Sequence, residues 1–351
     1  MEIEKIESCL DAGQFARALA GIKKTSAGDG RGRLLFMKGE AFRGLGLFAK
    51  ALEEYSRAKR AAHGDMEFEL EALIGEARCA RALGRESLAL ASAKKALALS
   101  GMSGVCEKEA GLEWALALRL SGRLAEASGL LVKLLKEYRG EGDHGGAAFT
   151  LWALGGLYRL QGRYKEGIRA FESALAEAKK DGDESAAGYA LFGLGGILRV
   201  AGFMGRALNC YVRARKIFAG TDDAFARAYA ECGTANVLRQ LGRLEEAWAG
   251  YVRAHKLYSG LSDQADLGFV EWGLGEIRKK NGDFRGAREH YRKAAALFKG
   301  RSEPRGEALT MLSLSALYYL TGDVPKAERQ HALAMKFIRR HGLHTHLEVF
   351  T

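Results

Sequence analysis

The sequence is poor in the residues that interrupt helices or build covalent and metal frameworks. Only two prolines occur in 351 residues, so long helices can run without the break that proline imposes. The five cysteines are scattered and include no Cys-x-x-Cys pair, which argues against a disulfide framework and indicates a reducing compartment. No apolar run approaches the roughly 18 residues of a membrane-spanning helix.

The first residues give no sign of a targeting segment. Residues 1–7 begin an amphipathic helix and lack the basic, apolar and small-residue regions of a signal peptide. Together with the missing membrane span, this predicts a cytoplasmic protein without membrane insertion.

Negative charge is scarce relative to positive charge. The formal net charge is +11, which favours an acidic partner. A carboxylate-rich peptide, a nucleic acid and an anionic membrane surface all satisfy this condition, and charge alone does not choose among them.

What the sequence does contain is an internal repeat. Between residues 145 and 300, glycines recur every forty residues, at Gly162, Gly202, Gly242 and Gly282. Each has a small residue seven positions before it, a small residue five after, an aromatic nine after and an alanine twelve after. A fixed period of this length predicts a solenoid of helix pairs, in which each pair buries its apolar face against its neighbours.

Extending the pattern in both directions predicts about nine helix pairs. The glycines that close the first helix of each pair are Gly13, Gly46, Gly84, Gly122, Gly162, Gly202, Gly242, Gly282 and Gly322. The predicted fold is an all-α, right-handed α-solenoid. We divide it into a capping helix pair at 1–25, less regular repeats at 33–141, regular forty-residue repeats at 142–340 and a tail at 341–351.

Acidic residues recur at one phase of the inter-repeat loops, where we expect them to cap the following helix. They are Asp143, Asp183, Asp223, Asp263 and Glu303.

The repeat resembles the tetratricopeptide repeat (TPR) family. The resemblance rests on motifs such as Leu154, Gly155, Tyr158 and Gly162, followed by Phe171 and Ala174, and covers nearly the whole chain. Its forty-residue period is similar to that of Leu-Gly-Asn adaptors and kinesin light chains. The resemblance implies a non-enzymatic adaptor that binds a peptide segment of another protein in a concave groove lined by the first helix of each pair.

A basic residue recurs three positions before the turn glycine, at what we call the cationic position. Its members are Arg43, Arg81, Arg119, Arg159, Arg199, Arg239 and Lys279. In the last repeat the equivalent residue is Tyr319. The resemblance implies that this position faces the groove. Helices pack about 8 to 10 Å apart, so successive members would be separated by about three residues of an extended ligand.

Two interpretations of these basic residues stay open. In the first, they pair with acids of the protein itself on adjacent helices or nearby, as Glu40 suggests for Arg43 and Glu276 for Lys279, each acid standing three residues before its cation. In the second, they bind an acidic ligand. Arg159, Arg199 and Arg239 favour the second, because the residues three and four positions before each of them are small or neutral.

Aromatic residues on the same helices are candidates for the apolar part of a ligand site. They lie ten or seven residues before the cationic position: Phe149, Trp152, Tyr189, Phe192, Tyr229 and Trp272. The alternative is that they form the core between repeats. Asn236, which follows the Thr-Ala version of the Leu-Gly motif, occupies the place where the resemblance implies a hydrogen bond to the ligand backbone.

Other functions find less support. No glycine-rich phosphate loop follows a strand, no catalytic constellation is present and the tail histidines lack the partners of a metal site, so we expect no catalysis, no cofactor and no metal. The combination of arginine and aromatic residues also suits single-stranded RNA, although no RNA-recognition motif accompanies it. A peptide-sensing regulator and self-association through the solenoid ends remain further alternatives.

Overall fold

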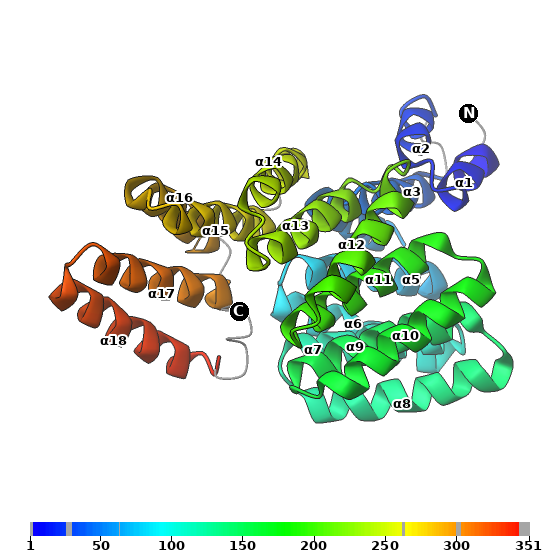
Figure 1. Ribbon diagram of the computed structural model, residues 1–351. Coiled ribbons are helices and arrows are strands. Elements are labelled where there is room, and N and C mark those ends of the chain that lie inside the picture. The colour runs from blue at the N-terminus through cyan, green and yellow to red at the C-terminus, as the bar shows by residue number, and fades with distance from the viewer. Residues whose placement is uncertain (1–2, 26–29, 63, 262–263, 300–302, 344–351) are drawn as a thin grey trace. The chain divides into compact units, whose positions relative to one another are not determined.

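The computed structural model describes residues 3–25, 30–62, 64–261, 264–299 and 303–343. Over these residues the chain forms eighteen α-helices and no strand (Figure 1), which confirms the predicted all-α fold of about nine helix pairs. None of the described helices combines the length and the apolar character needed to span a bilayer.

The first helix of each pair is called the A helix, and the second the B helix. The A helices are α1 (Ile3–Asp11), α3 (Arg31–Gly44), α5 (Met66–Ala82), α7 (Glu107–Leu120), α9 (His144–Leu160), α11 (Glu184–Val200), α13 (Ala224–Gln240), α15 (Gln264–Lys280) and α17 (Pro304–Leu320). The B helices are α2 (Phe15–Ile22), α4 (Phe48–Arg60), α6 (Glu86–Ser103), α8 (Leu124–Glu141), α10 (Tyr164–Asp181), α12 (Met204–Phe218), α14 (Leu244–Leu261), α16 (Phe284–Lys299) and α18 (Val324–Arg340).

The helices group into two compact units. Unit 1 comprises residues 1–157, 169–190 and 220–224, and unit 2 comprises residues 158–168, 191–219 and 225–351. The four segments predicted from repeat regularity remain a prediction about domain organisation.

The turn between the A and B helices is set by glycine. All nine predicted turn glycines have positive φ, between +67° and +86°. At Gly242 the amide of Arg243 donates a hydrogen bond to the carbonyl of Leu238 at 2.9 Å, which satisfies a carbonyl that the end of the helix leaves unpaired. The left-handed conformation explains why glycine recurs at this position.

The aromatic residue nine positions after the turn glycine packs between two A helices. In unit 2, a Cβ atom at Gly195 would lie 3.0 Å from the ring of Tyr211, and one at Gly233 would lie 2.2 Å from it. Tyr55 is enclosed by two glycines in the same way in unit 1. The small residues of the repeat therefore make room for an aromatic ring from the B helix.

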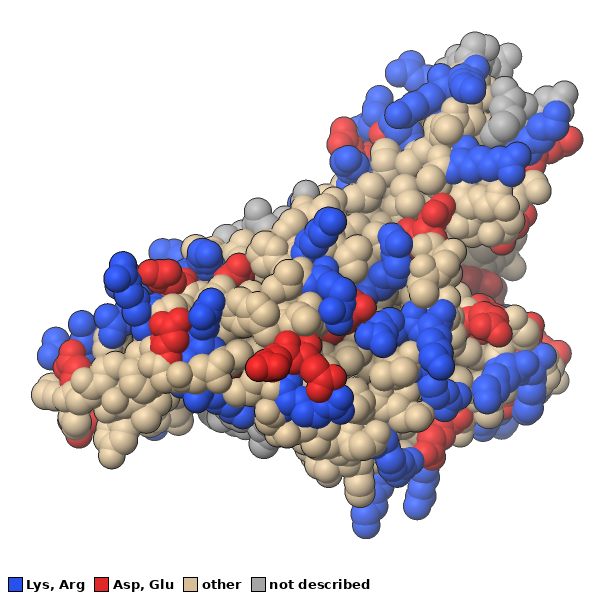
Figure 2. All heavy atoms as spheres, turned by 45° about the horizontal axis from the view of Figure 1, so that its top comes forward, with Lys and Arg blue, Asp and Glu red and all other residues tan. Residues whose placement is uncertain are grey.

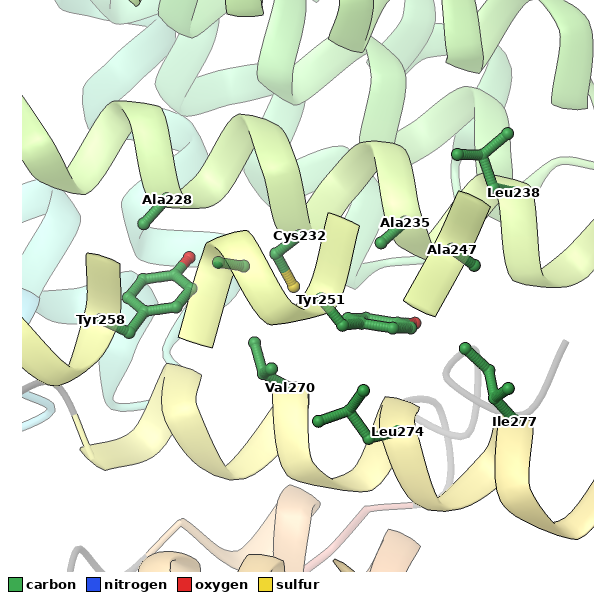
Figure 3. Packing of buried hydrophobic residues seen from close by; sticks show 11 residues of the cluster. Ala228, Cys232, Ala235, Leu238, Ala247, Tyr251, Tyr258, Val270, Leu274 and Ile277 are labelled. Carbon is green, nitrogen blue, oxygen red and sulfur yellow. The ribbon is translucent and has the colours of Figure 1, made fainter. Parts of the chain in front are cut away.

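The core of unit 2 shows the same packing around Tyr251. Its ring lies between α13 and α15, close to Ala235 on one side and Leu274 on the other (Figure 3). Tyr251 is fully buried, as is Tyr258 from the last turns of the same helix.

The cysteines carry no covalent framework. Cys9, Cys79, Cys210 and Cys232 are buried, Cys106 is partly buried, and all five are free thiols. Burial raises the pKa of both Cys79 and Cys232 to about 12, so these two thiols stay protonated at neutral pH.

Nearly all of the charged side chains that are buried are acidic. Lys and Arg outnumber Asp and Glu on the face shown in Figure 2. Among the described residues, the buried charged side chains are five glutamates and one arginine: Glu54, Glu76, Glu113, Glu271, Glu276 and Arg239. The accessible surface is thus more basic than the composition alone suggests.

The predicted acidic caps are confirmed in part. Asp143 and Asp183 each accept a hydrogen bond from the backbone amide three residues further on, at 2.7 and 2.8 Å. Asp223 accepts a hydrogen bond from a tyrosine hydroxyl of α11. Glu303 makes no side-chain cap, so the expectation is wrong there, and Asp263 lies outside the described residues.

Replacing a turn glycine should destabilise the protein through backbone strain alone. A Cβ at Gly242 would meet no atom within 4 Å, but φ is +77°. We expect Gly242→Ala to lower the free energy of unfolding by about 1 to 2 kcal/mol, the cost of a left-handed conformation for an L-residue. The thermal unfolding midpoint measures this effect.

The matched control is Gly129→Ala, inside α8. Its Cβ would also meet open space, and its backbone is helical. Because alanine is the better helix former by about 1 kcal/mol, this variant should raise the midpoint. A Gly242→Ala protein as stable as the unaltered chain would show that the positive φ is not required.

Candidate functional site

The candidate site is the cationic position of the A helices. Each of its seven members lies in the last turn of its helix, where a positive charge is favoured by the helix dipole. The dipole therefore gives one structural reason for a cation at this position. What each cation contacts decides whether it is available to a ligand.

Three members are neutralised by acids. Arg43 pairs with Glu40, Lys279 pairs with Glu276 at 2.8 Å, and Arg81 contacts Glu113 at 3.4 Å. The interpretation as internal ion pairs therefore applies to them.

Glu276 is the centre of a buried polar network. It is 7% exposed, and it accepts hydrogen bonds from Lys279, from the Tyr291 hydroxyl and from Ser313. Burial by itself would raise its pKa, but the charge of Lys279 and these hydrogen bonds outweigh burial and lower the pKa. Lys279, a predicted ligand contact, is thus committed to the packing of unit 2.

Two other members stack on tryptophan rings. In unit 1, Arg119 lies over Trp152 at 5.6 Å and donates a hydrogen bond to a backbone carbonyl of α9. In unit 2, Arg239 lies over Trp272 at 4.8 Å and donates a hydrogen bond to the Tyr251 hydroxyl at 3.2 Å. These cation–π contacts satisfy the guanidinium groups within the protein.

Arg239 and Trp272 are core residues in this structure. They are 5% and 4% exposed, and the Trp272 indole donates a hydrogen bond to Ser313 at 2.8 Å. Asn236 accepts a hydrogen bond from Tyr251 at 2.7 Å, so its carbonyl oxygen already has a partner. Its predicted hydrogen bond to a ligand remains a prediction.

Arg199 has a different environment. Its Nε atom is buried without a hydrogen-bond partner, and no described residue forms an ion pair with its guanidinium group. Its charge acts on Cys232, which occupies the place that Trp152 and Trp272 hold in other repeats. Neither an acid nor a tryptophan thus satisfies Arg199.

The surroundings of Arg199 are polar and include one acid, Asp266, whose charge acts on Cys232 and Tyr229. Burial raises the pKa of the Tyr211 hydroxyl, and the charges of Arg199 and Arg159 oppose this rise. Both charges also act on Tyr229, whose pKa is raised by burial. Two guanidinium groups and two phenols are therefore close enough to interact within unit 2.

The predicted aromatic residues fall into two groups. Phe192 is 4% exposed and stacks on Phe218 at 5.2 Å, so it belongs to the core, as Trp272 does. Phe149 is 39% exposed and stacks on the partly exposed Trp152 at 5.4 Å. The Phe149 ring is accordingly the more accessible candidate for ligand contact.

The two remaining aromatic candidates are partly exposed tyrosines. The Tyr189 hydroxyl donates a hydrogen bond to Asp223 at 2.6 Å in unit 1. Tyr229 packs beside Phe192 at 5.1 Å in unit 2.

A polar partnership across the helix pair was missed by sequence reasoning. The tyrosine nine positions after the turn glycine donates its hydroxyl proton to the residue six positions before that glycine. The pairs are Tyr55 with Glu40, Tyr251 with Asn236 and Tyr291 with Glu276. In the Arg199 repeat the equivalent of the acid is Gly196, so Tyr211 lacks this hydrogen bond. The two residues of each pair are fifteen positions apart in the sequence, and this constant spacing could have predicted the hydrogen bond.

No metal site is apparent in the part of the chain that the structure describes, where no three His, Cys, Asp or Glu side chains gather to hold an ion. His341 lies against a backbone carbonyl of α18, and the other two tail histidines lie outside the described residues.

The lowered pKa of Glu276 predicts a loss of stability in acid. Because its folded pKa lies below the unfolded value of about 4.3, its contribution is complete above that pH and is lost as the pH falls through the folded pKa. Glu276→Gln should lower the unfolding midpoint at about pH 7 and reduce the further drop between about pH 7 and about pH 3.5. Glu289→Gln, an exposed change on α16, should leave the pH profile unaltered. Equal profiles for the two variants would contradict this account.

The sequence of residues 109–180 matches the family described as tetratricopeptide repeat. This segment contains two of the nine helix pairs, α7 to α10, except for the first two residues of α7 and the last residue of α10. A comparison with curated proteins gives no match.

Solved structures with the same fold extend the similarity to most of the chain. A Rap protein complexed with Competence and Sporulation Factor has a TM-score of 0.68 at 19% identity, over 82% of this chain and 81% of that one. The apo form of the quorum sensor NprR from B. thuringiensis has a TM-score of 0.62 at 16% identity, over 95% and 97%. The apo form of RapI has a TM-score of 0.55 at 17% identity, over 77% and 98%. At these identities the likeness concerns the fold.

Proposed function

We propose that this chain, whose residues 109–180 match the tetratricopeptide repeat family, acts as a non-enzymatic interaction protein that binds an acidic segment of a partner protein. Within the cationic position we assign the principal contact to Arg199. The ligand class is a peptide that presents an aspartate, a glutamate or a C-terminal carboxylate.

The buried Nε donor of Arg199, which has no hydrogen-bond partner among the described residues, carries this proposal. A buried donor without a partner is costly, so a hydrogen bond supplied by a ligand gains more there than on an open surface. A carboxylate can accept two parallel N–H bonds from a guanidinium group. Such a charge-assisted contact contributes about 1.5 to 3 kcal/mol.

The neighbouring groups suit a carboxylate ligand. Tyr211 has no side-chain partner of the kind that Tyr251 and Tyr291 have, so its hydroxyl can donate a second hydrogen bond. The nearby charge of Arg159 adds to the positive potential. We assign to the buried Arg239, Phe192 and Trp272 the role of holding the helices that present Arg199.

On unit 1 we assign an apolar contact to the stack of Phe149 and Trp152. Phe149 exposes 39% of its surface on an A helix, although an aromatic ring gains most by burial. Arg119 also packs on the Trp152 ring, through a cation–π contact. This surface suits an aromatic or aliphatic side chain of a ligand.

The similar structures support a ligand-binding role. One of them is a Rap protein in complex with Competence and Sporulation Factor, and another is described as a quorum sensor. A regulatory sensor is therefore a second candidate beside a static adaptor. Ligand-induced compaction in small-angle X-ray scattering distinguishes the sensor, because an adaptor keeps its radius of gyration.

The test replaces the central cation. An array of octapeptides that vary in acidic and aromatic content is probed with the purified chain, and the tightest peptides are titrated by fluorescence anisotropy. Arg199→Glu should weaken their binding by about tenfold or more, equivalent to about 1.4 kcal/mol. The far-UV circular dichroism spectrum should be unchanged.

Arg169→Glu is the matched control, since it makes the same change of charge at an exposed position of α10. It should bind as the unaltered chain does. If both variants weaken binding equally, the effect of Arg199→Glu comes from the change in net charge and not from a specific contact. If the array shows no preference for acidic peptides, the proposal is refuted.

A further inference from the structure

A second set of basic residues lies on the B helices of unit 2. The C-terminal halves of α12, α14, α16 and α18 carry eleven Lys and Arg residues and no Asp or Glu. We call this set the basic strip: Arg213, Arg215, Lys216, Arg253, Lys256, Arg292, Lys293, Lys299, Lys336, Arg339 and Arg340. All of them are exposed except Arg215, which is partly exposed.

The basic strip follows the register of the repeat. Arg213, Arg253 and Lys293 each stand eleven residues after a turn glycine, and Lys216, Lys256 and Lys336 each stand fourteen after one. Residues three apart on a helix are neighbours on its surface, about 4.5 Å apart along the axis. The register of the repeat therefore places these cations at two equivalent positions of successive B helices, except that α18 has Leu333 at the first position and α16 has Ala296 at the second.

Helix stability does not require this arrangement. Cations near a helix C-terminus do interact favourably with the dipole. However, the same half of α10 in unit 1 carries Glu177 and Asp181, and that of α8 carries Glu137 and Glu141. The fold thus accepts acids in these positions, and their absence is particular to unit 2.

Few acids from other helices balance the basic strip. Glu231 of α13 pairs with Arg253 at 2.9 Å and lies 3.8 Å from Arg215. Glu271 of α15 attracts Lys293, although its hydrogen bonds go to two histidines. The other eight members form no ion pair with any described residue, so the protein itself does not balance their mutual repulsion.

The surface between the cations indicates the kind of anion. Two large apolar side chains on this surface are exposed, Val252 with an exposed fraction of 49% and Leu333 with 52%. Among the described residues, this surface presents no exposed aromatic ring. A protein partner would require an apolar centre, and a single-stranded nucleic acid would require rings for base stacking. Interfaces with duplex phosphates are instead polar and strongly positive.

We propose that the basic strip binds the sugar-phosphate backbone of double-stranded nucleic acid. Contacts to phosphates position a duplex without reading its bases, so binding is independent of sequence. This partner is additional to the acidic peptide and uses different residues.

The experiment measures binding of a fluorescent duplex of about 30 base pairs by anisotropy over a range of KCl concentrations, because phosphate neutralisation releases counterions. The affinity should fall steeply with salt. The double variant Arg213→Glu and Lys216→Glu should bind at least tenfold more weakly. Its plot of log affinity against log salt should be shallower by about 1.8, the value for two lost phosphate contacts.

The matched control is Lys133→Glu with Lys136→Glu, which changes the equivalent positions of α8 in unit 1. This control should retain duplex binding. Arg199→Glu should also retain it, so the duplex proposal can hold even where the peptide proposal fails. Equal losses in the two double variants would overturn the assignment to the basic strip. Preference for single-stranded poly(dT), polyglutamate or anionic phosphatidylserine vesicles over the duplex would overturn the choice of partner.

Discussion

The structure depends on one contact, the insertion of an aromatic ring from a B helix between the backbones of two A helices, as at Tyr55, Tyr211 and Tyr251. Tyr211 fits only because Gly195 and Gly233 have no Cβ atoms, which would approach the ring to 3.0 and 2.2 Å. A ring enclosed on both sides fixes the distance between successive A helices and their register. Equivalent positions of neighbouring repeats are consequently brought side by side.

This register explains why one periodic sequence produces two kinds of basic surface. On the A helices the cations are interleaved with acids and tryptophans, so most of them are satisfied inside the protein, and Arg199 stands out because Gly196 and Cys232 replace the usual partners. In the basic strip on the B helices of unit 2, most of the cations have no acidic partner among the described residues, and Arg215, Arg253 and Lys293 are the exceptions. In unit 2 the burial of Glu271 and Glu276 leaves fewer acidic side chains at the surface.

The two proposed ligands follow from this distribution of charge. A peptide carboxylate matches a small number of buried donors, where each hydrogen bond counts because water is excluded. A duplex backbone matches a long row of exposed cations, where each contact is weak and screened by salt but many act together. The same repeat thus supports a compact site and an extended one.

The sequence by itself determined the helix pairs, the turn glycines and the cap residues Asp143 and Asp183, because these features depend on residues within one turn of one another. It also determined that cations recur at one position. Tertiary structure decided which of them are available: Arg119 meets Trp152 and Arg81 meets Glu113 across more than thirty residues of sequence. Burial of Phe192 and Trp272 was decided in the same way, since it depends on how closely successive helices pack and not on the residues of either helix alone.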